Sequence, residues 1–303
     1  MCSFITANRY NREVMKQSVN KIKNFWWIPV GVLLIVGIVL GASYDLNIAK
    51  AIYAPGNLFG KIIEYVGSVP GYVLVGFVGP LLFIATRSSS KNWIKYLGFA
   101  AFFVIPLVSG LVLGYDVFYD SLHAVGFLGG MVVTMGLDAL LYLAFKNADP
   151  KDALKDAFII AISFAVTFIL VFLLKKLVER PRFIYVVSDL DAFKPLFDFS
   201  SKLDGVDESL LNSFPSGHSA IAATFLLVPL LCKYNEKTKN LQGIFFITAC
   251  LWLLITMLGR MSDGHHYLSD VCFGAFLGAL LSFLTNFFSK FVKLEKKDET
   301  ENG

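Results

Sequence analysis

Long apolar segments dominate the pattern of hydrophobic and polar positions along the chain. Six segments contain no Asp, Glu, Lys or Arg: residues 24–44, 65–86, 96–115, 157–174, 240–259 and 271–289. Two further apolar segments are less regular, because 121–145 contains Asp138 and 218–232 is short and begins at a histidine. A helix needs about 20 apolar residues to cross the hydrocarbon core of a bilayer. The pattern therefore predicts an all-α, polytopic transmembrane bundle with about eight spans, or six or seven if residues 218–232 do not cross fully.

The composition agrees with a membrane protein. Of the 303 residues, 56% are hydrophobic and 17% are charged, and the mean hydropathy is +0.63. Soluble domains average about 45–50% hydrophobic and about 25% charged residues. These values argue against a disordered chain and an ordinary soluble domain, and a net charge of only +4 argues against a nucleic-acid partner. The four cysteines form no CxxC pair, so we interpret them as packing residues.

The distribution of positive charge predicts the orientation of the spans. With a cytoplasmic N-terminus, 18 of the 27 Lys and Arg residues lie on the cytoplasmic side, in residues 1–23, 87–95, 146–156, 233–239 and 290–303. Cytoplasmic loops of membrane proteins carry such an excess. We therefore expect an integral protein of the cell (inner or plasma) membrane with both termini in the cytoplasm. Residues 1–23 and 291–303 would form cytoplasmic tails around one membrane domain, residues 24–290.

One cluster of bases contradicts this bias. The connection 175–217 is predicted to lie on the outer side, yet Lys175, Lys176, Arg180 and Arg182 stand close together near its start. Such bases could snorkel to the membrane interface, or they could attract an anion. Because snorkelling bases prefer the cytoplasmic side, we favour a role in binding an anion.

Two histidine-containing blocks lie at membrane boundaries on the same predicted side as these bases: residues 214–219 and 260–270. Arg260 adds a third cation to Lys175 and Arg182, and the arginine fork matches phosphate oxygens in bidentate fashion. Ser216 could donate its hydroxyl, and Gly217 lets the amides at the start of an apolar helix approach an anion. The three segments together predict an anion site at the outer surface.

The spacing of His266 and Asp270 suits nucleophilic chemistry. Side chains at i and i+4 lie on one face of a helix, so the Asp270 carboxylate could accept the Nδ1 proton and leave Nε2 free as a nucleophile. His218 supplies a second imidazole for proton transfer near neutral pH. His265 lacks this spacing to Arg260 and Asp270, and we interpret it as an edge of the site.

These blocks resemble the three signature motifs of the type-2 phosphatidic acid phosphatase (PAP2) superfamily. The motifs are Lys175-x6-Arg182, Pro215-Ser216-Gly217-His218 and Arg260-x5-His266-x3-Asp270. The family usually has Pro where this chain has Phe183, and Ser where it has Gly259; the second change removes a hydroxyl that could help to bind phosphate. The family core has six spans, so eight spans would mean an added hairpin near residues 96–145.

The resemblance implies a role for each motif residue. His266 would form a phosphohistidine, Asp270 would orient it, and His218 would protonate the leaving oxygen and then help to activate water. The phosphoryl oxygens would be held by the remaining motif residues: Lys175, Arg182, Ser216, Gly217 and Arg260. Neither a metal ion nor a cofactor is implied, since the bases supply the charge that Mg²⁺ would otherwise supply.

The function implied by the resemblance is metal-independent hydrolysis of a phosphomonoester or pyrophosphate on a membrane lipid at the extracytoplasmic face. Candidate substrates are phosphatidic acid, undecaprenyl diphosphate, phosphatidylglycerol phosphate and lipid A phosphate. One alternative is a lipid phosphotransferase that uses the same phosphohistidine, and another is a non-catalytic protein that binds or transports a lipid phosphate. The expected partners are the lipid substrate and the bilayer, and no protein partner is indicated.

Three weaker features each have a structural and a functional interpretation. Asp138 lies within a span, where acids are often functional, but we favour a position facing the bundle interior. Arg180 and Lys176 could attract anions or could be plain interface bases. Residues 183–214 mix phenylalanines with acids, and loops of this length are often functional lids. For this segment we favour a gate for a lipid chain over an ordinary surface loop held by aromatic packing.

Overall fold

The computed structural model describes residues 25–118, 123–199, 203 and 205–301, and all regular secondary structure in this part of the chain is helical. The elements are α2 (Trp27–Ile52), α3 (Leu58–Val66), α4 (Val69–Gly76), α5 (Val78–Thr86), α6 (Asn92–Phe118), α7 (His123–Phe145), α8 (Pro150–Val178), α9 (Phe183–Val186), η1 (Leu190–Ala192), η2 (Glu208–Leu211), α10 (Gly217–Thr224), η3 (Phe225–Tyr234), α11 (Gln242–Ser262) and α12 (Leu268–Glu301). Within these described residues, eight helical stretches are long and apolar enough to cross a membrane. This confirms the predicted all-α, eight-span bundle.

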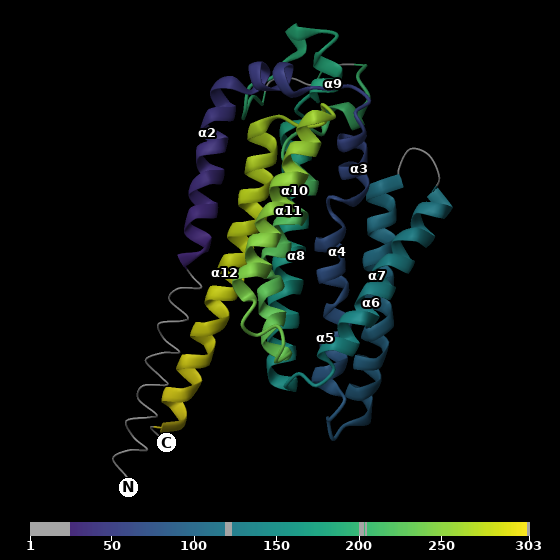
Figure 1. Ribbon diagram of the computed structural model, residues 1–303, viewed down its shortest axis with the longest axis vertical. Coiled ribbons are helices and arrows are strands. Elements are labelled where there is room, and N and C mark those ends of the chain that lie inside the picture. The colour runs from purple at the N-terminus through teal and green to yellow at the C-terminus, as the bar shows by residue number, and fades with distance from the viewer. Residues whose placement is uncertain (1–24, 119–122, 200–202, 204, 302–303) are drawn as a thin grey trace.

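The bundle has two distinct ends (Figure 1). The first turns of α2 and the last turns of α12 point toward one end, whereas the connection from α8 to α10, with α9, covers the other. The segment between α11 and α12 lies at this covered end, because Ile184 N donates to Gly264 O. The expected N-terminal tail falls outside the described residues. The segment expected as a C-terminal tail continues α12 as far as Glu301.

The second span is interrupted twice. α3 and α4 are separated at Gly67 and Ser68, and α4 and α5 are separated at Phe77. The Gly67 carbonyl at the first break accepts hydrogen bonds from two side chains of α11, Trp252 Nε1 at 2.9 Å and Thr256 Oγ1 at 3.4 Å. These bonds fix the end of α3 against α11.

The sixth span is short and consists of α10 followed directly by η3. More than half of it is 3-10 helix, and Pro229 lies within that part. α10 packs closely on α12. A Cβ added to Gly274 would lie 2.3 Å from Ser216 O, and one added to Gly278 would lie 2.2 Å from Ala220 O. Only glycine permits so close an approach of two helix backbones, and this contact holds the start of α10 against α12.

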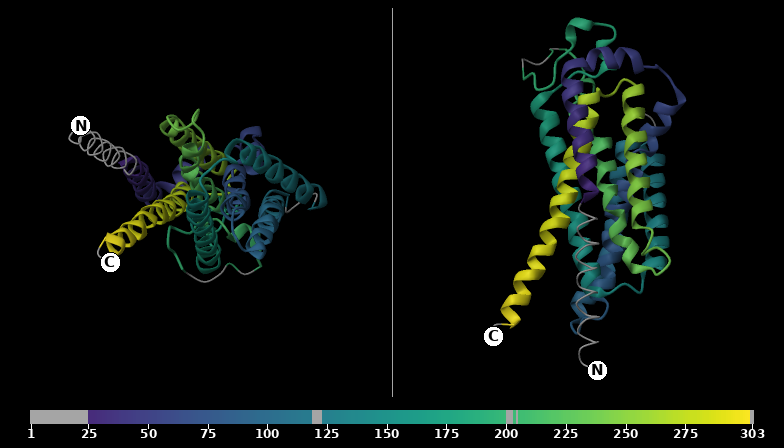
Figure 2. Two further views of the ribbon diagram at one scale, coloured as in Figure 1. Left: turned by 90° about the horizontal axis from the view of Figure 1, so that it is seen from below. Right: turned by 60° about the vertical axis from the view of Figure 1, so that its left-hand side comes forward.

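α6 and α7 form the hairpin that was expected near residues 96–145. It stands on the flank of the bundle opposite α2, with α8, α10 and α12 between them (Figure 2). Asp138 of α7 is buried and lies against Gly76 of α4, as expected for a position facing the bundle interior. Among the described residues, neither oxygen of its carboxyl group has a hydrogen-bond partner.

Candidate active site

A cavity of about 680 Å³ opens at the end of the bundle that the α8–α10 connection covers. Residues of α3, α8, α10 and the end of α11 contribute to its wall. Six of the eight predicted site residues line it: Lys175, Arg182, Gly217, His218, Arg260 and His266. The other two, Ser216 and Asp270, are fully buried behind the wall. The fold therefore brings three motifs that are distant in sequence to one cavity.

His266 is buried at the base of this cation-rich wall, with 2% of its surface exposed. Its Nδ1 lies 2.6 Å from the carbonyl oxygen of Ser213. Because a carbonyl oxygen can only accept, Nδ1 carries the ring proton and Nε2 keeps a lone pair. Burial, followed by the charges of Lys175, Arg260 and Arg182, lowers the pKa of His266 well below its ordinary value. The imidazole is therefore held neutral, which is the state of a nucleophile.

The predicted hydrogen bond between His266 and Asp270 is wrong. The Asp270 carboxylate is occupied by Arg180 Nη1 at 2.6 Å, Ser213 Oγ at 2.6 Å and Tyr267 N at 2.9 Å. The two residues are joined only through Ser213, whose carbonyl holds His266 and whose hydroxyl donates to Asp270. The sequence gives no sign of Ser213, because the group in contact with His266 is a backbone carbonyl, which every residue has.

Neither predicted role of Arg180 fits its contacts, since this side chain is enclosed by protein and does not line the cavity. It is fully buried. Besides Asp270, it donates to Asp45 Oδ2 at 2.9 Å, Ser269 Oγ at 2.8 Å and Lys194 O at 2.9 Å. Asp45 was not predicted as a partner, although an acid directly after an apolar run and inside a span is a signal for a functional or paired group.

The start of α10 presents backbone, rather than the Ser216 hydroxyl, to the cavity. Ser216 is the N-cap of α10, and its Oγ accepts from Ser219 N at 3.4 Å. The Ser216 side chain is fully buried and does not line the cavity, and its donation to an anion stays a prediction. A Cβ added to Gly217 would meet only Val171 Cγ1 at 3.7 Å and Lys175 Cε at 3.9 Å. The backbone at Gly217 thus lies open beside Lys175.

Arg260 is buried in the cavity wall between two carboxylates. Its Nη1 lies 2.9 Å from Asp263 Oδ2 and 3.6 Å from Glu64 Oε1. Its Nε is buried and has no hydrogen-bond partner in the described part of the chain. Burial would raise the pKa of Asp263, but Arg260 and His265 lower it overall. Burial lowers the pKa of His265, whose Nδ1 lies 2.9 Å from Asp263 Oδ1.

Both departures from the motif pattern have a packing reason. A Cβ added to Gly259 would lie 2.4 Å from Ile63 Cβ, so a residue of α3 fills the space that a serine side chain would need. Phe183 is buried, and its ring meets those of Tyr53 and Tyr267 edge-on at 5.2 and 6.1 Å. Neither change opens the wall of the cavity.

The connection 183–214 has features of a surface loop held by aromatic packing and also features of a gate beside the cavity. The ring of Phe197 packs against those of Phe214 and Phe273 at 5.5 and 5.9 Å. The same connection also supplies residues 207–209 and 212 to the cavity wall. Residues 200–202 and 204 of the connection fall outside the described residues.

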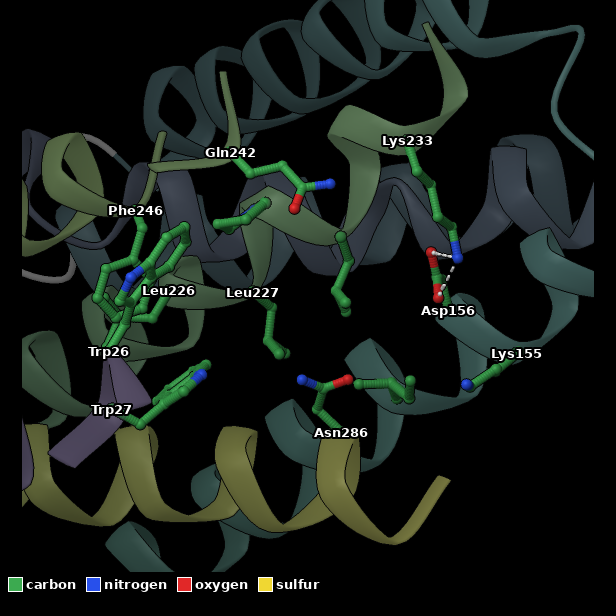
Figure 3. A pocket seen from close by; sticks show the side chains of 13 residues that line it. Trp26, Trp27, Lys155, Asp156, Leu226, Leu227, Lys233, Gln242, Phe246 and Asn286 are labelled. Carbon is green, nitrogen blue, oxygen red and sulfur yellow. Dashed lines mark hydrogen bonds and ion pairs between the residues drawn. The ribbon is translucent and has the colours of Figure 1, made fainter. Parts of the chain in front are cut away.

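A second cavity, of about 210 Å³, lies at the opposite end of the bundle. Figure 3 shows Gln242 and Asn286 pointing into it, and the ion pair of Lys233 with Asp156, 2.9 Å apart, at one side. None of the described residues that line it is a histidine or an arginine, and none belongs to the three motifs. Across the described ranges, no group of three or more His, Cys, Asp or Glu residues is placed to hold a metal ion.

Comparison with known proteins agrees with the motifs. Residues 156–292 match the family model of the PAP2 superfamily, and this range contains all three motifs. No curated protein matches the chain. Among solved structures, the chain is similar to the crystal structure of a transmembrane PAP2-type phosphatidylglycerolphosphate phosphatase from Bacillus subtilis, at 20% identity and a TM-score of 0.39. That match covers 86% of this chain and 96% of the other.

Proposed function

We propose that this chain, whose residues 156–292 match the family model of the PAP2 superfamily, hydrolyses a phosphate ester of a membrane lipid through a phosphohistidine at His266. The state of His266 carries the proposal. It is a neutral imidazole, with its Nδ1 proton held by Ser213, in a cavity lined by Lys175, Arg182 and Arg260. A neutral Nε2 is a nucleophile, and cations around it stabilise the charge of the phosphoryl group in transit.

The reaction proceeds in two steps. In the first, the Nε2 lone pair of His266 forms a bond to phosphorus while the bond from phosphorus to the lipid oxygen breaks. His218 donates a proton to that oxygen, so the lipid leaves as an alcohol. In the second step, His218 takes a proton from water, and the resulting hydroxide oxygen displaces His266 and releases inorganic phosphate. Asp270 acts behind His266, through Ser213.

The phosphoryl oxygens are held by cations and by the start of α10. Lys175, Arg182 and Arg260 supply positive charge, and the open backbone at Gly217 supplies amide donors at a helix N-terminus. This charge takes the place of the Mg²⁺ ion that many phosphoryl-transfer enzymes use. We therefore propose a metal-independent reaction.

The apolar part of the cavity wall supports a lipid substrate. Beyond the cationic end, the wall is formed by large apolar and aromatic side chains: Tyr72, Tyr115, Phe168, Phe172 and Ile221. Tyr115 and Phe172 are also more than half exposed, which leaves room for a hydrocarbon chain along this part of the wall. Ligand sites that combine an apolar wall with a few polar groups are typical of such molecules.

The test is release of inorganic phosphate from a panel of lipid phosphates by the purified protein in detergent. The panel contains phosphatidic acid, phosphatidylglycerol phosphate, undecaprenyl diphosphate and lipid A phosphate. We expect turnover that survives EDTA, is inhibited by vanadate, and passes through an acid-labile, base-stable phosphoenzyme. Transfer of phosphate to an added alcohol without release would favour the phosphotransferase alternative, and binding without turnover would favour a transport protein.

We also propose that the cavity faces the extracytoplasmic side. The 18 Lys and Arg residues in the predicted cytoplasmic segments support this orientation. In a background without native cysteines, Ser209→Cys should react with an impermeant maleimide on intact cells, and Glu236→Cys should react only after lysis. Labelling of position 236 but not 209 in intact cells would reverse the orientation and remove outer-leaflet lipids from the list of substrates.

A further inference from the structure

A carboxylate from outside the family-matched residues faces the catalytic cavity. Glu64, on α3, has its Oε1 at 3.6 Å from Arg260 Nη1 and 3.7 Å from His265 Nε2. Its backbone carbonyl accepts a hydrogen bond from His218 Nε2 at 3.1 Å. The Glu64 side chain is 34% exposed and lines the cavity. An acid therefore stands among the groups that are proposed to hold phosphate.

The packing of α3 on α11 keeps Glu64 in this place. Ile63, the preceding residue, occupies the space above Gly259, next to Arg260. The Gly67 carbonyl, one turn further along, accepts hydrogen bonds from Trp252 and Thr256. Contacts on both sides of Glu64 thus tie its backbone to the helix that carries Arg260, so this backbone position cannot move away from Arg260 without repacking of α3.

The position of Glu64 corresponds to the leaving-group side of the reaction. Displacement at phosphorus is in line, so the leaving oxygen lies opposite His266, where His218 is proposed to protonate it. Because the Glu64 carbonyl contacts His218, its carboxylate lies near the first atoms of the leaving group. In a lipid monophosphate these atoms belong to an uncharged alcohol, whereas in a lipid diphosphate they belong to a second phosphate.

The wall of the cavity carries little net positive charge, and Glu64 is one of its acids. Its lining includes four Lys or Arg residues (Lys175, Lys176, Arg182 and Arg260) and three acids (Glu64, Asp207 and Glu208). With neutral histidines this gives a formal charge of +1. A phosphomonoester carries about −1.5 to −2 at pH 7, and a diphosphate adds further negative charge beside Glu64. Like charges brought together at a binding site are strongly unfavourable.

We propose that Glu64 is a specificity-determining residue that makes this cavity selective for lipid monophosphates over lipid diphosphates. The inference rests on the proposed function, because its kinetic test measures the proposed hydrolysis. It narrows the proposed substrates to lipid monophosphates. The repulsion acts on the second phosphate only, so removing the charge of Glu64 should change the preference between two substrates more than it changes activity on the monophosphate.

The experiment uses two substrates with the same chain, farnesyl monophosphate and farnesyl diphosphate, with the full-length protein in detergent. For the wild type we expect kcat/KM to favour the monophosphate by at least ~10-fold, the scale of one unfavourable charge contact. Glu64→Gln should reduce this ratio by ~10-fold through a gain on the diphosphate. Glu64→Asp keeps the charge and should keep the preference, as should Glu208→Gln, which removes an exposed acid paired with Lys176.

Binding measurements separate this inference from the proposed function. In the His266→Ala background, which cannot form a phosphoenzyme, Glu64→Gln should lower the Kd for the diphosphate by ~10-fold relative to the monophosphate. If neither substrate is hydrolysed but this shift in Kd appears, the proposed function fails and the selectivity stands. A wild type that binds the diphosphate better, or a ratio that Glu64→Gln leaves unchanged, would overturn the selectivity.

Discussion

Arg180 and Arg182 are separated by one residue, yet they lie in regions of opposite character. Arg180 is fully buried and makes four hydrogen bonds to described residues, two of them to the carboxylates Asp45 and Asp270. Arg182 is only partly buried and lines the open cavity. The first arginine belongs to a closed network of charges, and the second belongs to a surface that can accept an anion.

The difference shows how one motif serves both folding and chemistry. A buried ion pair is stable only when its polar groups are satisfied, and the Arg180 network meets this condition with partners from α2, α12 and the chain after α8. Asp270 belongs to the closed network, and Ser213 connects it to His266. Arg260 in the open region keeps a buried Nε–H without a partner among the described residues. We therefore expect substitutions in the closed network to act mainly on stability and those in the open cavity to act mainly on turnover.

The largest effect is expected for His266. His266→Ala should abolish phosphoenzyme formation on every substrate, because no other group can replace the attacking Nε2. His218→Ala should depend on the leaving group, since general acid catalysis contributes ~10²–10⁴-fold and matters most for a poor leaving group. Its loss should be severe on a lipid phosphate and much smaller on p-nitrophenyl phosphate.

This comparison of the two histidines needs single-turnover phosphorylation, because His218 is also proposed to activate water in the second step. The burst of p-nitrophenol and trapped phosphoenzyme measure the first step alone. An equal loss on both leaving groups after His218→Ala would assign this residue to phosphate binding instead of proton transfer.

The next largest effect is expected for the closed network. Arg180→Ala leaves Asp45 and Asp270 buried without their cation, and removing one partner of a buried pair costs ~3–5 kcal/mol. We expect poor folding and a strongly lowered thermal midpoint, measured by fluorescence-detected size exclusion in detergent. Arg182→Ala should keep the thermal midpoint of the wild type but lose turnover. Similar thermal midpoints for the two variants would remove the distinction between the regions.

The spans and the cavity could be predicted from the sequence, whereas the closed network could not. Apolar segments reveal spans because the bilayer imposes a length of about 20 apolar residues, and the motif spacing brought Lys175, His218 and His266 to one cavity. By contrast, Arg180 and Arg182 are both arginines, and both lie in the connection between α8 and α10. Only packing decides which of them meets Asp45 from α2 and which faces the cavity. The contact between Ser213 and His266 uses a backbone carbonyl and has no signature in residue types.

A moderate effect is expected where α3 supports the open cavity. Gly259→Ser restores the residue usual in the family, but its Cβ would meet Ile63 at 2.4 Å. Overpacking of this kind costs ~1–3 kcal/mol, so we expect a lower thermal midpoint and reduced turnover as α3 shifts. Gly243→Ser, on the same helix with only ordinary contacts to Trp26 at 3.5 and 3.8 Å, is the matched control. A gain in activity from Gly259→Ser would show that α3 yields without cost.

A pH effect is also expected from His266. Its pKa in the folded protein lies well below the ordinary value of 6.5, so between these two values the unfolded chain binds a proton that the folded protein does not. Above pH 6.5 His266 is neutral in both states, so it does not lower the free energy of unfolding. Below pH 6.5 the free energy of unfolding falls as the pH decreases, by ~1.4 kcal/mol per pH unit until the pKa of the folded state is reached. Histidine-selective nitrogen NMR, assigned with His266→Ala, should show a neutral His266 ring at pH 6. A ring that is mostly protonated at that pH would contradict the assignment as a resting nucleophile.

The smallest effect is expected for Lys176, which is adjacent to a lysine of the open cavity. Lys176 pairs with Glu208 at 2.9 Å, but the two side chains are 51% and 71% exposed, and exposed pairs contribute ~0–1 kcal/mol. Lys175 is more buried and donates to Asn212 O at 2.7 Å beside Gly217. Lys176→Ala should therefore leave the thermal midpoint nearly unchanged and alter kcat/KM on p-nitrophenyl phosphate by less than ~3-fold. Lys175→Ala should lower kcat/KM by ~10²-fold or more, as expected for a group that stabilises the transition state. A loss of equal size in both variants would place Lys176 on the phosphate together with Lys175.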